Sequence, residues 1–99
     1  ENFKGGLAIW HIDNSSNCDY SNACDNSTPN IVDLEEANDA DLDNKSSRGR
    51  TTHLFYSGNN ATFDNSSTPN SKLTSGSSSG ISVTNISAAG DNMTFTISK

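Results

Sequence analysis

Apolar residues run almost unbroken through only one stretch of this chain, Gly6 to Asp13, which also carries the single tryptophan. Successive side chains of a strand point to opposite faces, so Leu7 and Ile9 would lie on the face opposite to Trp10. A strand that is apolar on both faces is usually central in its sheet or sandwiched between layers. The pattern therefore predicts a covered, central strand, with Trp10 buried and required for folding.

The clearest alternation of apolar and polar residues lies near the end of the chain. Residues 81–86 and 92–98 both show it, which is typical of half-buried strands. The connection between them contains Gly90, where a positive φ would suit a turn. We therefore expect a C-terminal β-hairpin. The side chains expected to face the core are Met93, Phe95 and Ile97.

Residues 31–37 form a shorter apolar segment whose conformation is ambiguous. Ile31 and Val32 favour a strand, whereas the following Leu-Glu-Glu-Ala favours a helix by intrinsic propensity. The run is short and no N-cap precedes the two glutamates at a useful spacing. These features favour the strand.

Residues 53–56 are a second short apolar cluster, either a strand or a loop that places Leu54 and Phe55 in the core. From 61 to 80 the sequence is nearly low in complexity, with Ser and Gly in proportions typical of flexible linkers. The apolar anchors of this segment are Phe63 and Leu73.

Composition limits the size of the core. Only 30% of the 99 residues are hydrophobic, fewer than the 14 Asn and 17 Ser together. The apolar residues nevertheless cluster in short β-branched and aromatic runs, which argues against disorder of the whole chain. We expect an all-β fold, a small antiparallel β-sandwich-like domain with long polar loops, in which residues 1–99 form a single domain that is a fragment of a longer protein.

The excess of acidic residues argues against nucleic acids and anionic membranes as partners. Twelve acidic residues against six basic ones give a net charge of −6, whereas nucleic acids and anionic membrane surfaces attract clustered Lys and Arg. No run approaches the ~18 apolar residues that span a bilayer. We therefore expect no nucleic-acid binding and no membrane insertion, and cations are the more natural partners.

An acidic loop supplies the only candidate metal ligands. Asp39, Asp41 and Asp43 form a D-x-D-x-D pattern, and carboxylate oxygens are the ligands that Ca²⁺ prefers. An EF-hand loop would require glycine at Asn44 and glutamate at Arg50, so the match is incomplete. A calcium site and a solvated acidic loop both remain open, and the solvated loop is the commoner arrangement.

The only cysteines, Cys18 and Cys24, are separated by five residues in a polar segment. This spacing does not fit a zinc site, and neither histidine is placed to complete one. We expect a disulfide between Cys18 and Cys24 rather than free thiols. A disulfide would place the protein in an oxidising compartment.

No catalytic constellation is complete in the sequence. There is no HExxH zinc motif and no nucleophile elbow. Glu35 and Glu36 would point to opposite sides of a strand and could not act as a glycosidase pair. His11 and Asp13 share one strand face, which favours a structural hydrogen bond over catalysis. We assign no catalytic residues to this chain.

Several segments, taken in order, resemble the region downstream of the catalytic HExxH in M6-type (immune inhibitor A-like) secreted metallopeptidases. The first is Gly6-Leu7-Ala8-Ile9-Trp10-His11-Ile12-Asp13, similar to the "GLLIWHID" strand of that family. The others are Val32-Asp33-Leu34-Glu35-Glu36-Ala37, Leu54-Phe55, Ser79-Gly80-Ile81 with Asn85-Ile86-Ser87, and Met93-Thr94-Phe95-Thr96-Ile97. His53 replaces the aspartate that the family has before Leu-Phe, so any cation site of the family there is in doubt for this chain.

This resemblance implies an extracellular or periplasmic zinc-dependent peptidase as the parent protein, with the present chain as its non-catalytic β region. Its partner would be the upstream catalytic domain, which it would support or complete. The alternative is an extracellular binding or adhesion module for a glycan or a protein, stabilised by calcium if the acidic loop is filled. The chain offers few large side chains to cover both faces of residues 6–13, so we expect part of one face to pack against a neighbouring domain.

Overall fold

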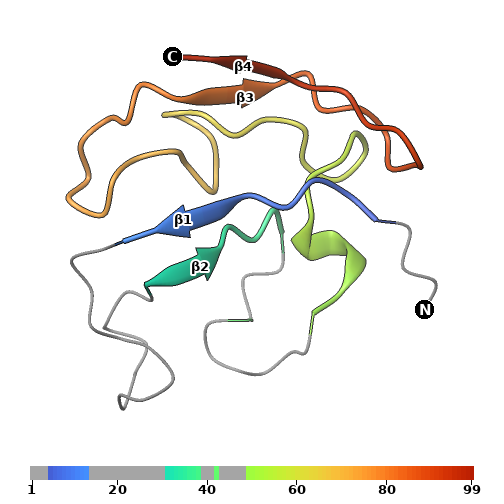
Figure 1. Cartoon of the computed structure of the whole chain (residues 1–99), viewed down its shortest axis with the longest axis horizontal. Helices are drawn as coiled ribbons and strands as arrows, with labels where there is room; N and C mark the ends of the chain where they lie inside the picture. The colour runs from blue at the N-terminus through green and yellow to red at the C-terminus, as the bar shows by residue number, and fades with distance from the viewer. Residues whose placement is uncertain (1–4, 14–30, 39–41, 43–48) are drawn as a thin grey trace.

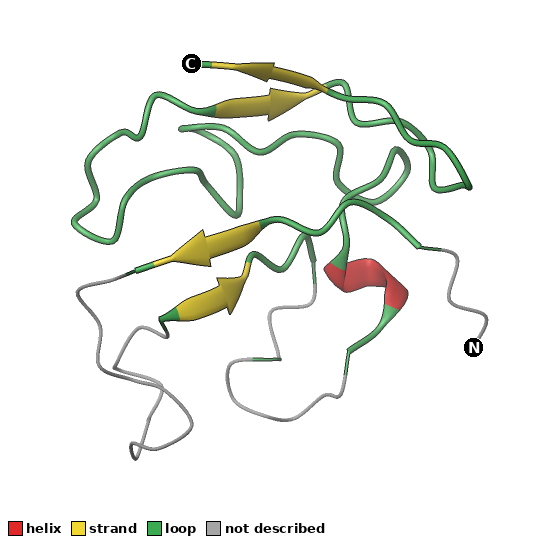
Figure 2. Cartoon of the chain, in the orientation of Figure 1, coloured by secondary structure: helices red, strands yellow, loops and turns green. Residues whose placement is uncertain are grey.

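The computed structural model describes residues 5–13, 31–38, 42 and 49–99 of the chain. In these residues β1 (Trp10–Ile12) pairs with β2 (Val32–Leu34), and β3 (Ser82–Thr84) pairs with β4 (Thr96–Ser98). A 3-10 helix, η1 (Thr51–His53), lies between the two sheets in the sequence. Most of the remaining described chain is loop or turn (Figure 2). The predicted all-β fold is thus confirmed as a β-rich small domain, whose described residues form two antiparallel sheets of two strands each (Figure 1).

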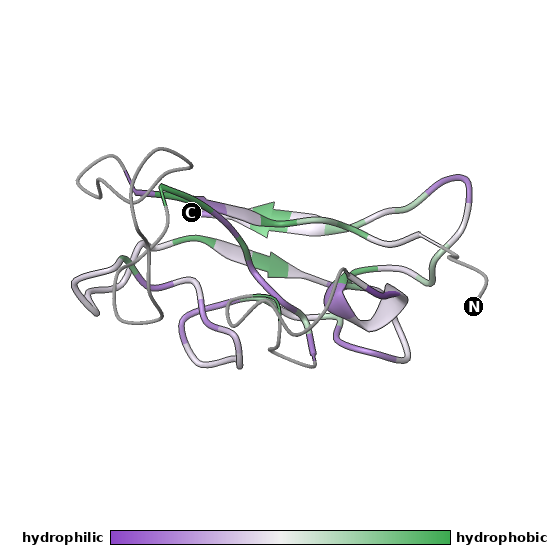
Figure 3. Cartoon of the chain, turned by 90° about the horizontal axis from the view of Figure 1, so that it is seen from below, coloured by the Kyte–Doolittle hydropathy of each residue, from purple (hydrophilic) through white to green (hydrophobic). Residues whose placement is uncertain are grey.

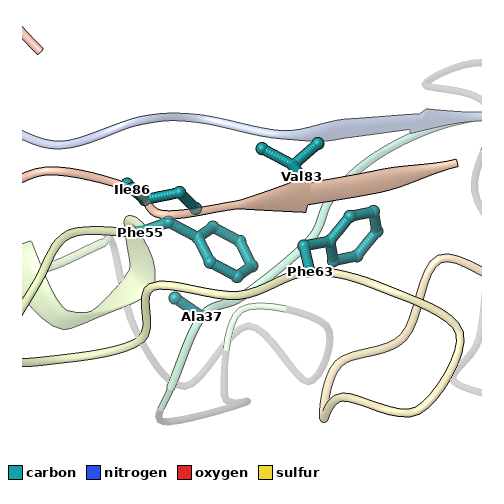
Figure 4. Packing of buried hydrophobic residues seen from close by; sticks show 5 residues of the cluster. All are labelled: Ala37, Phe55, Phe63, Val83 and Ile86. Carbon is teal, nitrogen blue, oxygen red and sulfur yellow. The ribbon is translucent and has the colours of Figure 1, made fainter. Parts of the chain in front are cut away.

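The hydrophobic core lies between the sheets and is built from distant parts of the chain. Its two rings, Phe55 and Phe63, meet edge to face, with centroids 5.7 Å apart and an interplanar angle of 74° (Figure 4). Edge-to-face contact is a favoured geometry because the positive edge of one ring meets the negative face of the other. The buried cluster consists of Ala37, Phe55, Phe63, Val83 and Ile86. The prediction that Phe55 enters the core is confirmed, while Leu54 is only half-buried.

Backbone bridges connect this core to the sheets. Leu7 and Phe55 exchange two backbone hydrogen bonds, with N···O distances of 2.8 and 3.0 Å. Phe63 and Val83 do the same at 2.7 and 2.8 Å, which places the segment around Phe63 beside β3. The predicted anchor at Phe63 is therefore confirmed. The second predicted anchor, Leu73, is wrong as a core residue because its side chain is half exposed.

The first sheet confirms a strand at Val32–Leu34, where the sequence was ambiguous. It contradicts the expectation that both faces of residues 6–13 are covered. Trp10 is 57% exposed and Ile12 is 54% exposed, so one face of β1 lies in solvent in the part of the chain that the structure describes. Leu7 and Ile9, on the other face, pack against the core. Because the chain has so few large apolar residues, other described residues bury only one face of β1.

The C-terminal hairpin is confirmed in its pairing and corrected in its details. β3 and β4 are antiparallel, with Val83 opposite Ile97. Among the described residues, the only non-glycine residue with a positive φ is Asn85, at 52°, and Gly90 does not have one. Asparagine tolerates this conformation well. Of the side chains expected in the core, only Met93 packs against it.

Phe95 and Ile97, also expected in the core, are 43% and 63% exposed. Ile97 shares a sheet face with Val83, because directly opposite residues point the same way. Val83 is buried by its position between β4 and the Phe63 segment, whereas β4 pairs with a single neighbour in the part of the chain that the structure describes. Seen from below, the molecule is thin, and hydrophobic residues alternate with hydrophilic ones along the chain (Figure 3).

Candidate functional site

The solvent-facing side of the first sheet is apolar. Trp10 lies opposite Leu34 and Ile12 lies opposite Val32, so these four side chains share one face, here called the outer face. Val32 is 54% exposed, the same fraction as Ile12. Exposed apolar residues that gather on one face, rather than occurring singly, mark interaction sites in soluble proteins.

A groove runs along β1 on the side opposite to β2. It has a volume of about 170 Å³, and we call it the β1 groove. One wall is β1 itself, and the other comes from the core residue Phe63 and the 71–81 segment, which lies beside β1 in Figure 1. The lining residues are Trp10, His11, Ile12, Glu35, Phe63, Ser71, Lys72, Leu73, Ser79 and Ile81. Five of the lining residues are apolar, and the polar ones include one acidic and one basic side chain, Glu35 and Lys72.

His11 connects the two walls of this groove. Its Nδ1 lies 3.2 Å from Oε1 of Glu35, and its Nε2 lies 3.4 Å from the hydroxyl of Thr74. The same hydroxyl donates to Oδ2 of Asp13 over 3.0 Å. His11 and Asp13 therefore both bond to Thr74, and these bonds attach the 71–81 segment to β1.

The second histidine lies in a separate, buried site. His53 is 2% exposed, and its Nε2 lies 3.9 Å from Oε2 of Glu36. Its Nδ1 accepts the backbone N–H of Arg50 at 3.0 Å, and Oε2 of Glu36 accepts that of Leu42 at 3.1 Å. Both groups hold backbone in place and neither lines the groove. Glu35 and Glu36 thus serve different sides of the chain, as the sequence predicted.

The residues that the sequence singled out as ligands or as a disulfide lie outside the described residues. They are Asp39, Asp41, Asp43, Cys18 and Cys24. The calcium site and the disulfide therefore stay predictions. Among the residues that the structure does describe, no group of three or more His, Cys, Asp or Glu side chains is arranged to hold a metal ion, and no helix is long and apolar enough to cross a membrane.

Sequence reasoning missed the far wall of the groove. Thr74, Lys72 and Leu73 lie in a segment that looked like a linker, and the partners of Thr74 are 61 and 63 residues away. The one local signal was Leu73, an apolar residue in a polar stretch that ends at Ile81, the start of the expected hairpin.

Comparison of the chain with protein-family models, with curated proteins and with solved structures found no match. The resemblance to M6-type peptidases rests on the sequence motifs alone. The exposed outer face and the β1 groove are the structural features from which a function can be argued.

Proposed function

We propose that this chain is a non-catalytic β domain of a secreted M6-like zinc metallopeptidase, and that it supports the catalytic domain by docking through its outer face. In this proposal the fold is sandwich-like with long polar loops, the parent is extracellular or periplasmic, and the chemistry belongs to the upstream domain. The motif order supports the family, and the exposed apolar face supports the docking.

The observation that carries the proposal is the exposure of Trp10, Ile12 and Val32 on one sheet face. Burying a large apolar side chain is worth about 1.5–3 kcal/mol, which this chain does not gain for these residues on its own. A partner that covers the outer face would supply that stabilisation. Tryptophan is also among the residues enriched at the energetic centre of interfaces.

Trp10→Ala tests this proposal. We expect the variant to weaken binding of the chain to the separately produced upstream domain by about 2 kcal/mol or more, roughly thirtyfold, as for other interface anchors. Stability of the isolated chain should change by no more than about 0.5 kcal/mol, as at other exposed sites. Isothermal titration calorimetry measures the first quantity and urea unfolding the second.

Ile97→Ala is the matched control, because Ile97 is similarly exposed but lies on β4 in the other sheet. It should leave binding unchanged. Unfolding of the isolated chain by Trp10→Ala would show that Trp10 is a core residue, and equal binding by both variants would exclude the outer face as the docking surface.

The alternative, a binding or adhesion module for a glycan or a protein, draws support from the β1 groove, whose lining includes Trp10, Glu35 and Lys72. The two readings differ in what precedes the chain. An HExxH motif encoded upstream of Glu1 is required by the peptidase reading, and its absence from the parent gene would leave the binding module.

Calcium binding at Asp39, Asp41 and Asp43 is a separate proposal with a direct test. A ligand that binds only the folded state stabilises it. At a calcium concentration one hundred times Kd, the free energy of unfolding should rise by about 2.7 kcal/mol, and the melting temperature should rise with it. EGTA should reverse the shift. A melting temperature that responds to neither would assign these residues to a solvated loop.

A further inference from the structure

β1 uses only one of its two edges for hydrogen bonding to β2. The backbone N–H of Glu35 donates to the carbonyl of Ile9, and the N–H of Asp13 donates to the carbonyl of Ile31, both over 2.8 Å. Hydrogen-bonded and non-hydrogen-bonded pairs alternate along an antiparallel ladder. The backbone groups of the odd-numbered residues of this strand therefore face β2.

The even-numbered residues of β1 point the other way. Trp10 and Ile12 stand opposite Leu34 and Val32 in the non-hydrogen-bonded positions of the ladder. Their N–H and C=O groups are directed to the opposite edge, and no backbone hydrogen bond joins them to another described segment of the chain. This free edge is short, apolar and without proline or lysine, the residues that commonly block edge pairing.

The free edge opens into the β1 groove. Trp10 and Ile12 line the groove on one side, and Leu73 and Ile81 line it on the other. Thr74 holds the 71–81 segment to the end of β1 through its bond to Asp13. The strand edge thus lies beside the preformed β1 groove rather than against a flat surface.

We propose that an extended peptide segment of the docking partner adds to the free edge of β1 as a further strand. Strand addition satisfies main-chain donors and acceptors with the same groups of the incoming chain, while alternate side chains give specificity. The source of the segment rests on the proposed function; the strand addition itself rests on the edge and the groove.

The geometry also specifies the chemistry of this segment. Side chains on its outer side lie next to Trp10 and Ile12, so they are apolar and extend the outer face by one strand. Side chains on its inner side approach His11 and the groove-lining Glu35 in a chain of net charge −6. Within the groove Glu35 is offset by Lys72, so the attraction comes from the net charge of −6 of the chain as a whole. A segment that alternates apolar and basic residues matches that charge.

Amide hydrogen exchange reads the edge directly. In the free chain the amides of Trp10 and Ile12 should exchange fast, whereas those of His11 and Asp13 are protected by β2. The synthetic peptide acetyl-(Lys-Val)₃-amide should slow exchange at Trp10 and Ile12 and shift the fluorescence of the single tryptophan. The two amides could instead be protected in the absence of peptide, with protection that increases with the concentration of the chain. This result would show that a second copy of the chain occupies the edge, and it would overturn the proposal.

Backbone methylation of the peptide separates strand addition from simple adhesion to the apolar face. N-methylation of alternate amides removes the donors on one edge of the peptide only. Of the two peptides methylated on opposite edges, one should bind at least about tenfold more weakly than the other, as expected for the loss of two or more hydrogen bonds. Equal affinities for the two peptides would overturn the proposal.

Ile12→Pro tests the protein side, since proline removes the N–H that points into the groove and leaves the β2 ladder intact. Val32→Pro is the matched control: Val32 has the same 54% exposure and the facing position of the ladder, and its N–H points away from β1. Ile12→Pro should reduce peptide affinity at least about tenfold and Val32→Pro much less. Equal losses in two folded variants would contradict the proposal, and the methylated peptides decide it on the unaltered chain if a variant fails to fold.

The outcomes for the two proposals are distinguishable. Binding of the synthetic peptide without binding of the upstream domain would reject the peptidase-support function and keep strand addition at β1. The upstream domain could instead bind, and Trp10→Ala could weaken that binding, while the amides of Trp10 and Ile12 still exchange fast in the complex. This result would keep the docking and reject strand addition.

Discussion

Phe55→Ala is expected to destabilise the domain by about 3–5 kcal/mol, the usual cost of truncating a buried aromatic residue. Phe55 has no solvent exposure, forms the edge-to-face contact with Phe63, and lies in the segment that bridges to Leu7. Domains are stable by only about 5–15 kcal/mol in total. The urea midpoint should therefore fall by a large fraction.

Phe95→Ala makes the same chemical change at a ring that is 43% exposed. It should cost much less than Phe55→Ala, because less apolar surface and less packing are lost. Similar midpoints for the two variants would show that the core is not centred on Phe55.

Gly6→Ala is expected to be the second most damaging change. A Cβ at this position would lie 2.6 Å from Cβ of Leu54 and 3.3 Å from the carbonyl oxygen of Phe55. Cβ of Leu54 is fixed to the backbone and cannot rotate away, so the chain must shift beside the Leu7–Phe55 bridge. Forcing an extra methyl into such a contact costs about 1–3 kcal/mol. Urea unfolding measures the loss.

Gly5→Ala separates the close contact from backbone strain. Gly5 has a φ of +86°, but nothing lies within 4 Å of a Cβ placed there. The variant should lose about 1 kcal/mol, the cost of a side chain in a left-handed conformation. If Gly5→Ala were as damaging as Gly6→Ala, the approach of Leu54 would not explain the need for glycine at position 6.

Local pattern was sufficient to predict elements whose partners lie nearby in the sequence. The alternation in residues 81–86 and 92–98 correctly predicted the pairing of β3 with β4, and β-branched Val32 marked β2. Alternation does not say which sheet face will be covered. Phe95 and Ile97 follow the pattern of buried residues and are exposed. Ile97 lies on β4, which among the described residues has a sheet neighbour on one side only.

The groove could not be predicted because it depends on long-range contacts. Thr74 reaches His11 and Asp13 across more than half of the chain, and no local spacing encodes that meeting. The exposure of Trp10 was not predicted for a related reason. Its apolar neighbours predicted a covered strand, and the same sequence correctly indicated that the chain has too few large residues to cover both faces.

The Leu7–Phe55 bridge also has a consequence for biosynthesis. Leu7 is made 48 residues before Phe55, the partner whose backbone it binds. At a translation rate of about 5–20 residues per second, Phe55 is synthesised roughly 2–10 s after Leu7. The most apolar stretch of the chain therefore lacks its pairing partner for that time. During that interval the apolar residues of this stretch are exposed, and chaperones or other nascent chains can bind them before the domain folds.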